Sequence, residues 1–509
     1  MIPMTLARIA DIIGIPVPAP ADADVVVTSV EFDTRKVTQG ALFVALLGER
    51  VDGHDFAAAA AAAGAVAALG SHPLDGTGET LPLLQVPDND AVLQALSQIA
   101  AVSVAELVER GGLTVIGVTG SAGKTSTKDL IASVLRAGFG DSTRASGASG
   151  DDTVVAPPES FNNELGHPYT ALRAGAGTRF LVMELSARGI GHIAALAASV
   201  PPRIGAVLNV GTAHLGEFGS VEAIANAKGE LVEALPPASA GGVAILNADD
   251  PRVLAMSART TAEVVTVGTG TGAVVRAVDV TNDGGARAHF TLVTPEGSAP
   301  VSLQVVGAHQ VGNALVAAAV GRAVGMAVAQ IADALDGSRP ASRWRMEITE
   351  RADGVTVIND AYNANPESMR AALQSLAVIG EHRHTWAVLG EMAELGDLAQ
   401  QAHDAIGRLV VRLGVDRLIV VGQAARPLHL GAHLEGSWGG ESEIVDDMDA
   451  ALAILSAQLE PEDVVLVKAS RSVGLDRLAT ALLAEASTLT SVPEGDAATT
   501  GSSTSQEPV

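Results

Sequence analysis

The stretch from Leu113 to Leu135 reads L-T-V-I-G-V-T-G-S-A-G-K-T-S-T-K-D-L-I-A-S-V-L and decides the fold. Its apolar start predicts a buried strand over Leu113–Val118, its small residues predict a turn over Thr119–Gly123, and the remainder favours a helix over Lys124–Leu135. A strand, a glycine-rich turn and a helix that opens on Lys-Thr form the context of a phosphate-binding loop. We therefore predict such a loop over Gly117–Ser126.

The loop contains the residue types that phosphate binding requires. Gly120 and Gly123 allow the backbone to wrap around an anion, and the N–H groups at the helix start carry a partial positive charge. Lys124 is placed to reach the outer phosphates, and the hydroxyl of Thr125 is placed to bind magnesium. The predicted nucleotide contacts of the loop are Gly120, Ser121, Ala122, Gly123, Lys124, Thr125 and Ser126.

One position of the loop departs from the usual pattern. The pattern G-x-x-x-x-G-K-[ST] requires glycine at position 118, whereas the chain has Val118 there and its first glycine is Gly117. The plain alternative is a glycine-rich turn with an incidental lysine, but the strand–turn–helix context favours the phosphate loop. Nucleotide binding by itself leaves motors, kinases and ligases open as functions.

Composition limits the class of protein. A chain of 509 residues, 48% of them hydrophobic, is long enough for about three domains. The net charge of -26 argues against nucleic acid or an anionic membrane as a partner, since both need clustered Lys and Arg. The absence of cysteine excludes disulfides and cysteine-based zinc sites. No signal-peptide pattern opens the sequence, and the apolar run over 56–69 is too short for a membrane span, so we expect a cytoplasmic protein.

Strand-like runs alternate with helical segments along most of the chain, which predicts parallel sheets with helices on their faces. The predicted fold is α/β in three domains: a small N-terminal domain, a central phosphate-loop domain with a mostly parallel sheet, and a Rossmann-like C-terminal domain. The predicted bounds are 1–112, 113–339 and 340–485. A disordered tail is predicted over 486–509, because its Ser-, Thr- and Gly-rich composition buries little apolar surface.

The individual elements are predicted from the apolar runs. The first unit should have a strand over 42–47 and helices over 56–68 and 92–107. The central unit should have strands over 113–118, 180–185, 204–210 and 243–246, an antiparallel excursion over 268–305 and a mobile surface loop over 138–160. The last unit should follow a hinge over 337–342 and have strands over 355–358, 386–389, 417–421 and 464–467.

Polar residues follow several of these strands. Glu184 ends one central strand and His214 follows the next, and the carboxyl ends of parallel strands face the ligand crevice of such a sheet. Lys228 lies on the helical segment that comes after. Taken singly they are a solvated acid, a structural histidine and a surface lysine, but together they can surround one phosphate and metal site. Asp360 begins D-A-Y-N-A-N-P after a strand of the last unit, where it can reach ribose hydroxyls or close a polar turn.

At this point the chain resembles a known family, the Mur ligases, which are ATP-dependent amide-forming enzymes of peptidoglycan synthesis. The loop G-V-T-G-S-A-G-K-T has their glycine spacing, and the resemblance runs in the family's three-domain order from about residue 28 to residue 480. Four stretches are most similar to the members that add D-alanyl-D-alanine to UDP-N-acetylmuramoyl-tripeptide. They are S-F-N-N-E-L-G-H-P at 160–168, M-E-L-S-A-R-G-I-G-H-I at 183–193, N-D-A-Y-N-A-N-P-E-S-M at 359–369 and L-G-E-M-A-E-L-G at 389–396.

The resemblance implies a role for each matching residue. Lys124 would contact the β- and γ-phosphates of ATP, and Thr125 and Glu184 would hold one Mg²⁺. His214 and Lys228 would help to hold a second Mg²⁺, with Lys228 carbamylated so that it offers a carboxylate-like ligand. The further contacts that the resemblance implies are Asn313 for the adenine region, Arg343 and Asp360 for phosphate and ribose, Thr34, Arg35, Asp52 and His54 for the UDP-sugar end, and Asn162 and Asn163 beside the substrate.

The resemblance also implies a reaction. The tripeptide carboxylate would become an acyl phosphate, which the amine of D-alanyl-D-alanine would attack after domain closure. The expected partners are these two substrates, without nucleic acid or stable membrane insertion, and the enzyme is expected to be a monomer. The alternatives are a Mur-type ligase for another acceptor amine, and a nucleotide-gated binding protein with a dead site. Two residues depart from the family pattern, because Ser186 and Ala469 stand where glycine is usual.

Overall fold

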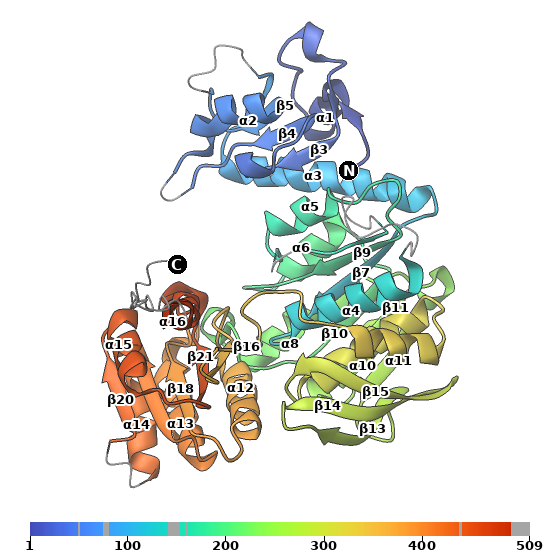
Figure 1. The fold of residues 1–509 in the computed structure, drawn as a ribbon. Coiled ribbons are helices and arrows are strands. Elements are labelled where there is room, and N and C mark those ends of the chain that lie inside the picture. The colour runs from blue at the N-terminus through green and yellow to red at the C-terminus, as the bar shows by residue number, and fades with distance from the viewer. Residues whose placement is uncertain (49–50, 75–80, 141–152, 158–160, 437–439, 490–509) are drawn as a thin grey trace, which may run out of the picture.

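The chain forms three α/β bodies that follow one another in chain order (Figure 1). The structure is a computed structural model, and it describes all residues except 49–50, 75–80, 141–152, 158–160, 437–439 and 490–509. The N-terminal body, in blue, lies against one end of the central body, and the C-terminal body, in orange and red, lies beside the central body. The predicted three-domain α/β architecture is thereby confirmed.

The N-terminal domain has a parallel sheet of four short strands in the order β3-β4-β5-β6. The strands of the domain are β1 Met4–Thr5, β2 Val26–Val27, β3 Ser29–Glu31, β4 Ala41–Val44, β5 Ala65–Gly70 and β6 Leu83–Gln85. The helices are α1 Leu6–Ile13, α2 Ala57–Ala63 and α3 Asn89–Glu109. The predicted strand over 42–47 therefore ends earlier, at Val44.

The alanine-rich run of this domain changes from helix to strand, so the single helix predicted over 56–68 is wrong. Helix α2 ends at Ala63, Gly64 has a φ of 112°, and β5 begins at Ala65. A Cβ on residue 64 would lie 2.9 Å from Cα of Gln39, so the turn requires glycine. Alanine fits helix and strand alike, and a run of alanines has no period that separates the two.

The central domain has a nine-stranded sheet in the order β15-β14-β13-β12-β11-β10-β7-β9-β8. Strands β8 to β13 pair in parallel, and β13, β14 and β15 pair antiparallel, which confirms the predicted excursion. The strands are β7 Thr114–Thr119, β8 Val154–Val155, β9 Phe180–Glu184, β10 Ile204–Val207, β11 Val243–Asn247, β12 Glu263–Gly268, β13 Val275–Asn282, β14 Arg287–Thr294 and β15 Gly297–Val306. The helices are α4 Lys124–Phe139, α5 Gly166–Ala171, α6 His192–Ser199, α7 Leu215–Phe218, α8 Val221–Glu233, α9 Pro251–Ala255, α10 Gln310–Ala323 and α11 Val328–Gly337.

The C-terminal domain has a six-stranded sheet in the order β16-β17-β21-β18-β19-β20, in which only β16 is antiparallel to its neighbour. The strands are β16 Glu347–Glu350, β17 Thr356–Asn359, β18 Thr385–Leu389, β19 Arg417–Val421, β20 Ser442–Val445 and β21 Val464–Lys468. The helices are α12 Pro366–Ile379, α13 Ala399–Arg412, α14 Arg426–Glu435, α15 Met448–Gln458 and α16 Asp476–Leu489. The sequence did not predict β16 and β20, because these edge strands, E-I-T-E and S-E-I-V, contain no apolar run.

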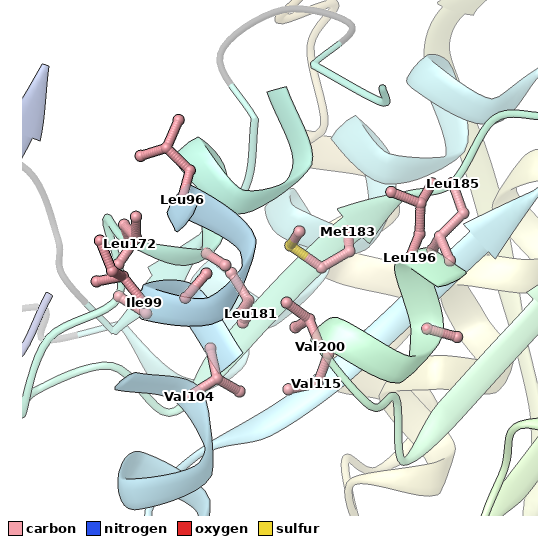
Figure 2. Close-up of a cluster of buried hydrophobic side chains, with 14 of the residues drawn as sticks. Leu96, Ile99, Val104, Val115, Leu172, Leu181, Met183, Leu185, Leu196 and Val200 are labelled. Carbon is pink, nitrogen blue, oxygen red and sulfur yellow. The ribbon is translucent and has the colours of Figure 1, made fainter. Parts of the chain in front are cut away.

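Helix α3 joins the N-terminal and central domains through one hydrophobic core. Figure 2 shows Leu96, Ile99 and Val104 of α3 beside apolar side chains of the central domain, among them Leu172, Leu181 and Met183. The same core includes residues of the N-terminal sheet such as Leu42 and Leu69. Among the described residues α3 is the one helix that is long and apolar enough to cross a membrane, and here its buried residues pack into this shared core.

Two predicted segments fall partly on residues that the structure does not describe. Of the loop predicted over 138–160, α4 covers the start and β8 covers Val154–Val155, whereas 141–152 and 158–160 lie outside the described residues. Of the tail predicted over 486–509, α16 extends to Leu489, and 490–509 lies outside the described residues.

Candidate active site between the central and C-terminal domains

A cavity of about 740 Å³ lies between the central and C-terminal domains. Its central-domain wall comes from the loop after β7 and from the residues that follow β9 and β10. Strands β9 and β10 flank β7 and run parallel to it, so all three end at one edge of the sheet. Its other wall comes from segments that follow β17, β18 and β21. The predicted site residues that line the cavity are Ser121, Ala122, Gly123, Lys124, Thr125, Ser126, Asn162, Asn163, Glu184, His214, Asn313 and Asp360.

Glycine is required at two points of the loop after β7. Gly123 has a φ of 83°, and a Cβ there would lie 2.7 Å from Oδ1 of Asn313. A Cβ at Gly120 would lie 2.8 Å from Cβ of Leu208. Asn313 packs against the loop, and its Oδ1 also accepts a hydrogen bond from Thr127 at 3.0 Å. The backbone thus turns tightly at the start of α4, where its N–H groups can face an anion.

The loop's own polar groups are paired within the protein. Nζ of Lys124 donates to the carbonyl of Gly120 at 2.8 Å, and the N–H of Ala122 donates to Oδ1 of Asn209 at 2.9 Å. Burial lowers the pKa of the Lys124 ammonium, and the charge of Glu184 opposes that shift. A phosphate group would supply the negative charge that this buried ammonium lacks.

The hydroxyl of Thr125 and the carboxylate of Glu184 lie together at the sheet edge. Thr125 donates to Oε2 of Glu184 at 3.0 Å, and Nδ2 of Asn162 donates to Oε1 at 2.8 Å. Nη2 of Arg345 donates to the same Thr125 hydroxyl at 3.0 Å. A buried carboxylate beside a hydroxyl is an all-oxygen pair of the kind that Mg²⁺ prefers.

Lys228 is buried in α8 beside Lys124. Burial, together with the positive charge of Lys124, lowers the pKa of the Lys228 ammonium to about 7. Lys228 is one of only five lysines in the chain, of which Lys36 alone is exposed. The other two, Lys128 and Lys468, are buried and ion-paired. An amine with a pKa near 7 has a large neutral fraction at pH 7, and the neutral form is a nucleophile.

His214 stands at the start of α7 and faces the C-terminal domain. Its Nδ1 lies 2.7 Å from Oε2 of Glu394, which belongs to the segment after β18. Contact with His214, more than any other group, lowers the pKa of the Glu394 carboxyl. The sequence predicts His214 from its place after a strand, whereas it gives Glu394 no role beyond its place in the L-G-E-M-A-E-L-G stretch.

Asp360 lies on the opposite wall and is bound within its own domain. Its Oδ2 lies 2.6 Å from Nζ of Lys468, and its Oδ1 accepts from the N–H of Met346 at 3.0 Å. Lys468 also donates to the carbonyl of Asn363 at 2.8 Å. Asp360 therefore anchors the loop after β17 as well as lining the cavity, and the sequence did not predict Lys468 as its partner.

Replacing Lys468 by Met should destabilise the C-terminal domain by about 3–5 kcal/mol, because Asp360 would remain buried without its counter-charge. All three tryptophans lie in this domain, so tryptophan fluorescence during urea unfolding measures the change. Adding Asp360→Asn to the variant should recover much of the loss. Equal unfolding midpoints for the wild type and Lys468→Met would contradict the buried pair.

Arg345, rather than the predicted Arg343, reaches the cavity. Arg343 is exposed and stacks near Trp344, whereas Arg345 lines the cavity and lies 4.1 Å above the ring of Tyr362. Trp344 and Met346 have φ values of 59° and 50°, so the chain kinks on both sides of Arg345 and turns it inward. The two arginines are equivalent in a sequence that reads S-R-W-R, and the kink distinguishes them.

The predicted UDP-sugar residues lie in the N-terminal domain and do not line this cavity. Nη2 of Arg35 lies 2.8 Å from Oδ2 of Asp33, and hydrogen bonds from Arg35 hold the pKa of Asp33 at about 2. Thr34 lies between them in a short 3-10 turn. Of these residues Arg35 is exposed, whereas Thr34 and Asp33 are half-buried, and the segment lies apart from the nucleotide loop.

A second polar group of the N-terminal domain is centred on Asp52. Its two oxygens lie 2.6 Å from Nδ1 of His54 and 2.9 Å from Nε2 of His72, and the two rings stack. Nε2 of His54 accepts the N–H of Ser71 at 2.9 Å, so Nδ1 is the protonated nitrogen. Asp52 and His54 are thus close together as their motif suggests, and His72 is an additional member.

The chain matches three protein-family models in order. These are "Mur ligase family, catalytic domain" over residues 26–109, "Mur ligase middle domain" over 118–321 and "Mur ligase, glutamate ligase domain" over 344–471. The chain belongs to the Mur ligase family. The sequence predicted this family from the glycine spacing of the phosphate loop and from the order of the domains. The matched ranges of this Mur ligase agree with both.

Named relatives cover almost the whole of this Mur ligase. The UDP-N-acetylmuramoyl-tripeptide--D-alanyl-D-alanine ligase of Mycobacterium tuberculosis H37Rv is 51% identical over 95% of the chain and 98% of its own length. The ligase of the same name from Escherichia coli K12 is 34% identical over 95% of the chain and 99% of its own length. Among solved structures, MurF from Acinetobacter baumannii has a TM-score of 0.78 at 29% identity, covering 95% of this chain and 99% of that one. MurF from Thermotoga maritima, solved with ADP, has a TM-score of 0.71 at 26% identity, covering 91% and 98%.

Proposed function

We propose that this Mur ligase joins D-alanyl-D-alanine to UDP-N-acetylmuramoyl-tripeptide, with conversion of ATP to ADP and phosphate. The observation that carries the proposal is the 51% identity, over 95% of the chain, to a ligase named for that reaction. The cavity supports it, because residues of the phosphate loop and of the C-terminal domain line one space. The proposed enzyme acts as a cytoplasmic monomer without nucleic acid or membrane insertion.

Magnesium fits the residues at the sheet edge. Thr125 and Glu184 would hold one ion, and their oxygens lie 3.0 Å apart at the foot of the phosphate loop. His214 and Lys228 would help to hold a second ion, provided that Lys228 is carbamylated. Its low pKa supports this, since only a neutral amine adds to carbon dioxide. Bound magnesium would neutralise phosphate charge and polarise the bond that breaks.

The reaction proceeds in two steps within the cavity. The tripeptide carboxylate attacks the γ-phosphorus, the bond to ADP breaks and an acyl phosphate forms. The amine of D-alanyl-D-alanine then attacks the carbonyl carbon, loses a proton and expels phosphate. Lys124 and Arg345 line the cavity, where they would stabilise the negative charge that the phosphate oxygens gain. Closure of the C-terminal domain would exclude water that could hydrolyse the acyl phosphate.

The proposal predicts that phosphate release from ATP requires both cosubstrates. The purified protein is incubated with ATP, Mg²⁺, UDP-N-acetylmuramoyl-tripeptide and D-alanyl-D-alanine, and phosphate is measured together with the peptide product. Release should fall to background when either cosubstrate is left out. Hydrolysis that does not depend on D-alanyl-D-alanine would refute the proposal. A higher rate with another amine from a panel would indicate a different acceptor substrate. Nucleotide binding without turnover would indicate a binding protein with an inactive site.

A further inference from the structure

Two residues with left-handed backbone face each other across the domain boundary. His214 of the central domain has a φ of 62°, and Glu394 of the C-terminal domain has a φ of 63°. This conformation is unfavourable for residues with a side chain, and it is concentrated at functional sites, where the surrounding structure holds it in place. His214 and Glu394 are therefore both candidates for a functional role that requires this backbone conformation.

The two loops that carry these residues are in direct contact. The N–H of Gly216 donates to the carbonyl of Glu394 at 3.2 Å. A Cβ on Gly216 would lie 2.7 Å from the backbone nitrogen of Gly396, and a Cβ on Gly396 would lie 2.8 Å from Cα of Gly216. Two glycines thus allow the domains to approach to backbone contact at this point, beside the pair formed by His214 and Glu394.

A second carboxylate of the C-terminal domain strengthens the same junction. Oε1 of Glu367, near the start of α12, accepts hydrogen bonds from the N–H of Thr212 at 2.9 Å and from its hydroxyl at 3.0 Å. A Cβ on Gly211 would lie 2.6 Å from that oxygen. The segment that contains His214 is therefore a docking surface for the C-terminal domain, fixed by Glu367 on one side and approached by Glu394 on the other.

Glu394 differs from Glu367 because it contacts a ring nitrogen of a site residue. Nδ1 of His214 lies 2.7 Å from Oε2 of Glu394, although the pair is too bent to count as a hydrogen bond. The side chain of Glu394 is 41% exposed, so burial alone does not fix it. Such contacts are often misaligned before ligands bind and become aligned in the complex.

A histidine that binds a metal through one nitrogen commonly donates the N–H of its other nitrogen to a carboxylate, which fixes the tautomer and the ring. We propose that Glu394 is the positioning residue for His214: it holds Nδ1–H, leaves Nε2 for the metal, and occupies that place only when the C-terminal domain has docked. The second metal position is then completed by domain closure. This inference rests on the proposed function, since it concerns the metal that His214 and Lys228 would hold.

The consequence for the reaction is an ordering of events. The metal position that His214 serves is fully formed only in the docked state, so phosphoryl transfer is restricted to the conformation in which water is excluded. The contact joins residues 180 positions apart in the sequence and belongs to neither domain alone.

The test compares Glu394→Ala with Glu394→Gln in the full-length protein, and uses Asp397→Asn as a matched control that removes one exposed carboxylate from the same loop. Mn²⁺ affinity is measured by electron paramagnetic resonance in the presence of ADP, which needs no peptide substrate. Glu394→Ala should weaken Mn²⁺ binding about 10–100-fold, the usual effect of removing a carboxylate behind a metal-bound histidine. Glu394→Gln should remain close to the wild type, because its amide oxygen still accepts the N–H.

Three outcomes would overturn the proposal: unchanged Mn²⁺ affinity in Glu394→Ala, an equal loss in Asp397→Asn, or a loss in Glu394→Gln as large as in Glu394→Ala. The last would mean that the carboxylate binds the metal itself. Gly216→Ala provides an independent variant, since its Cβ would force the loops apart with both side chains intact, and it should show the same loss. Because the Mn²⁺ titration involves no ligation, a failure of the proposed reaction would appear separately in the phosphate-release assay.

Discussion

Replacing Lys124 by Met is expected to reduce the ligation rate by about 10²–10³-fold, the usual effect of removing one preorganised group that stabilises charge in the transition state. Lys124 lies at the start of α4, and among the residues that the structure describes the carbonyl of Gly120 is the one hydrogen-bond acceptor of its ammonium. Burial lowers the pKa of Lys124, so a bound phosphate would strongly stabilise the charged form of its side chain. Steady-state phosphate release with both cosubstrates measures the effect.

The loss at Lys124 should arise in catalysis and not in folding. The thermal unfolding midpoint of Lys124→Met should equal or exceed that of the wild type, because a buried ammonium is removed. Lys124→Arg should recover only part of the rate, since the planar guanidinium does not reproduce a compact point charge. A Lys124→Met protein that ligates at the wild-type rate with saturating ATP would show that the loop does not serve phosphoryl transfer.

Replacing Lys228 by Met is expected to abolish ligation while stabilising the fold. The loss follows from the proposed metal site, which would lose a carbamate ligand. The gain follows from the pKa of Lys228, which burial lowers from its ordinary value of 10.5 to about 7 in the folded chain. That difference corresponds to an upper bound on the order of 5 kcal/mol at pH 7. Differential scanning calorimetry should show a higher midpoint for the variant.

The pH dependence of this effect has a definite sign. Between pH 7 and 10.5 the unfolded chain binds more protons at Lys228 than the folded chain does, so the stability of the wild type should rise with pH over that window. Lys228→Met should lack this contribution, and the two unfolding curves should converge as the pH approaches 10.5. A Lys228→Met protein that is both less stable and fully active would contradict the buried, neutral amine and the metal role together.

The fold was predictable where the signal is local. The phosphate loop and strands β9 and β11 follow from short apolar runs bounded by small residues, and the structure places them within two residues of the predicted bounds. The alanine run at the end of α2 was not predictable, because a methyl side chain fits either conformation and a single residue, Gly64, decides where the helix ends.

The candidate site was predictable to the same extent. Glu184 and His214 could be found because residues that follow adjacent parallel strands gather at one edge of a sheet. Arg345 could not be told from Arg343, since the choice depends on a backbone kink. Glu394 could not be found at all, because its partner lies in another domain and no sequence period records contacts between domains.

The scarcity of lysine gives this protein a simple chemical signature. Of its five lysines, Lys124 is hydrogen-bonded inside the cavity, Lys128 and Lys468 are ion-paired and buried, and Lys36 is exposed. Burial lowers the pKa of Lys228 to about 7, and among the described residues its amine, unlike those of the other buried lysines, has no hydrogen bond or ion pair. Protein equilibrated with ¹³C-labelled bicarbonate should therefore give a single carbamate line in its ¹³C spectrum, and in Lys228→Met that region should be empty.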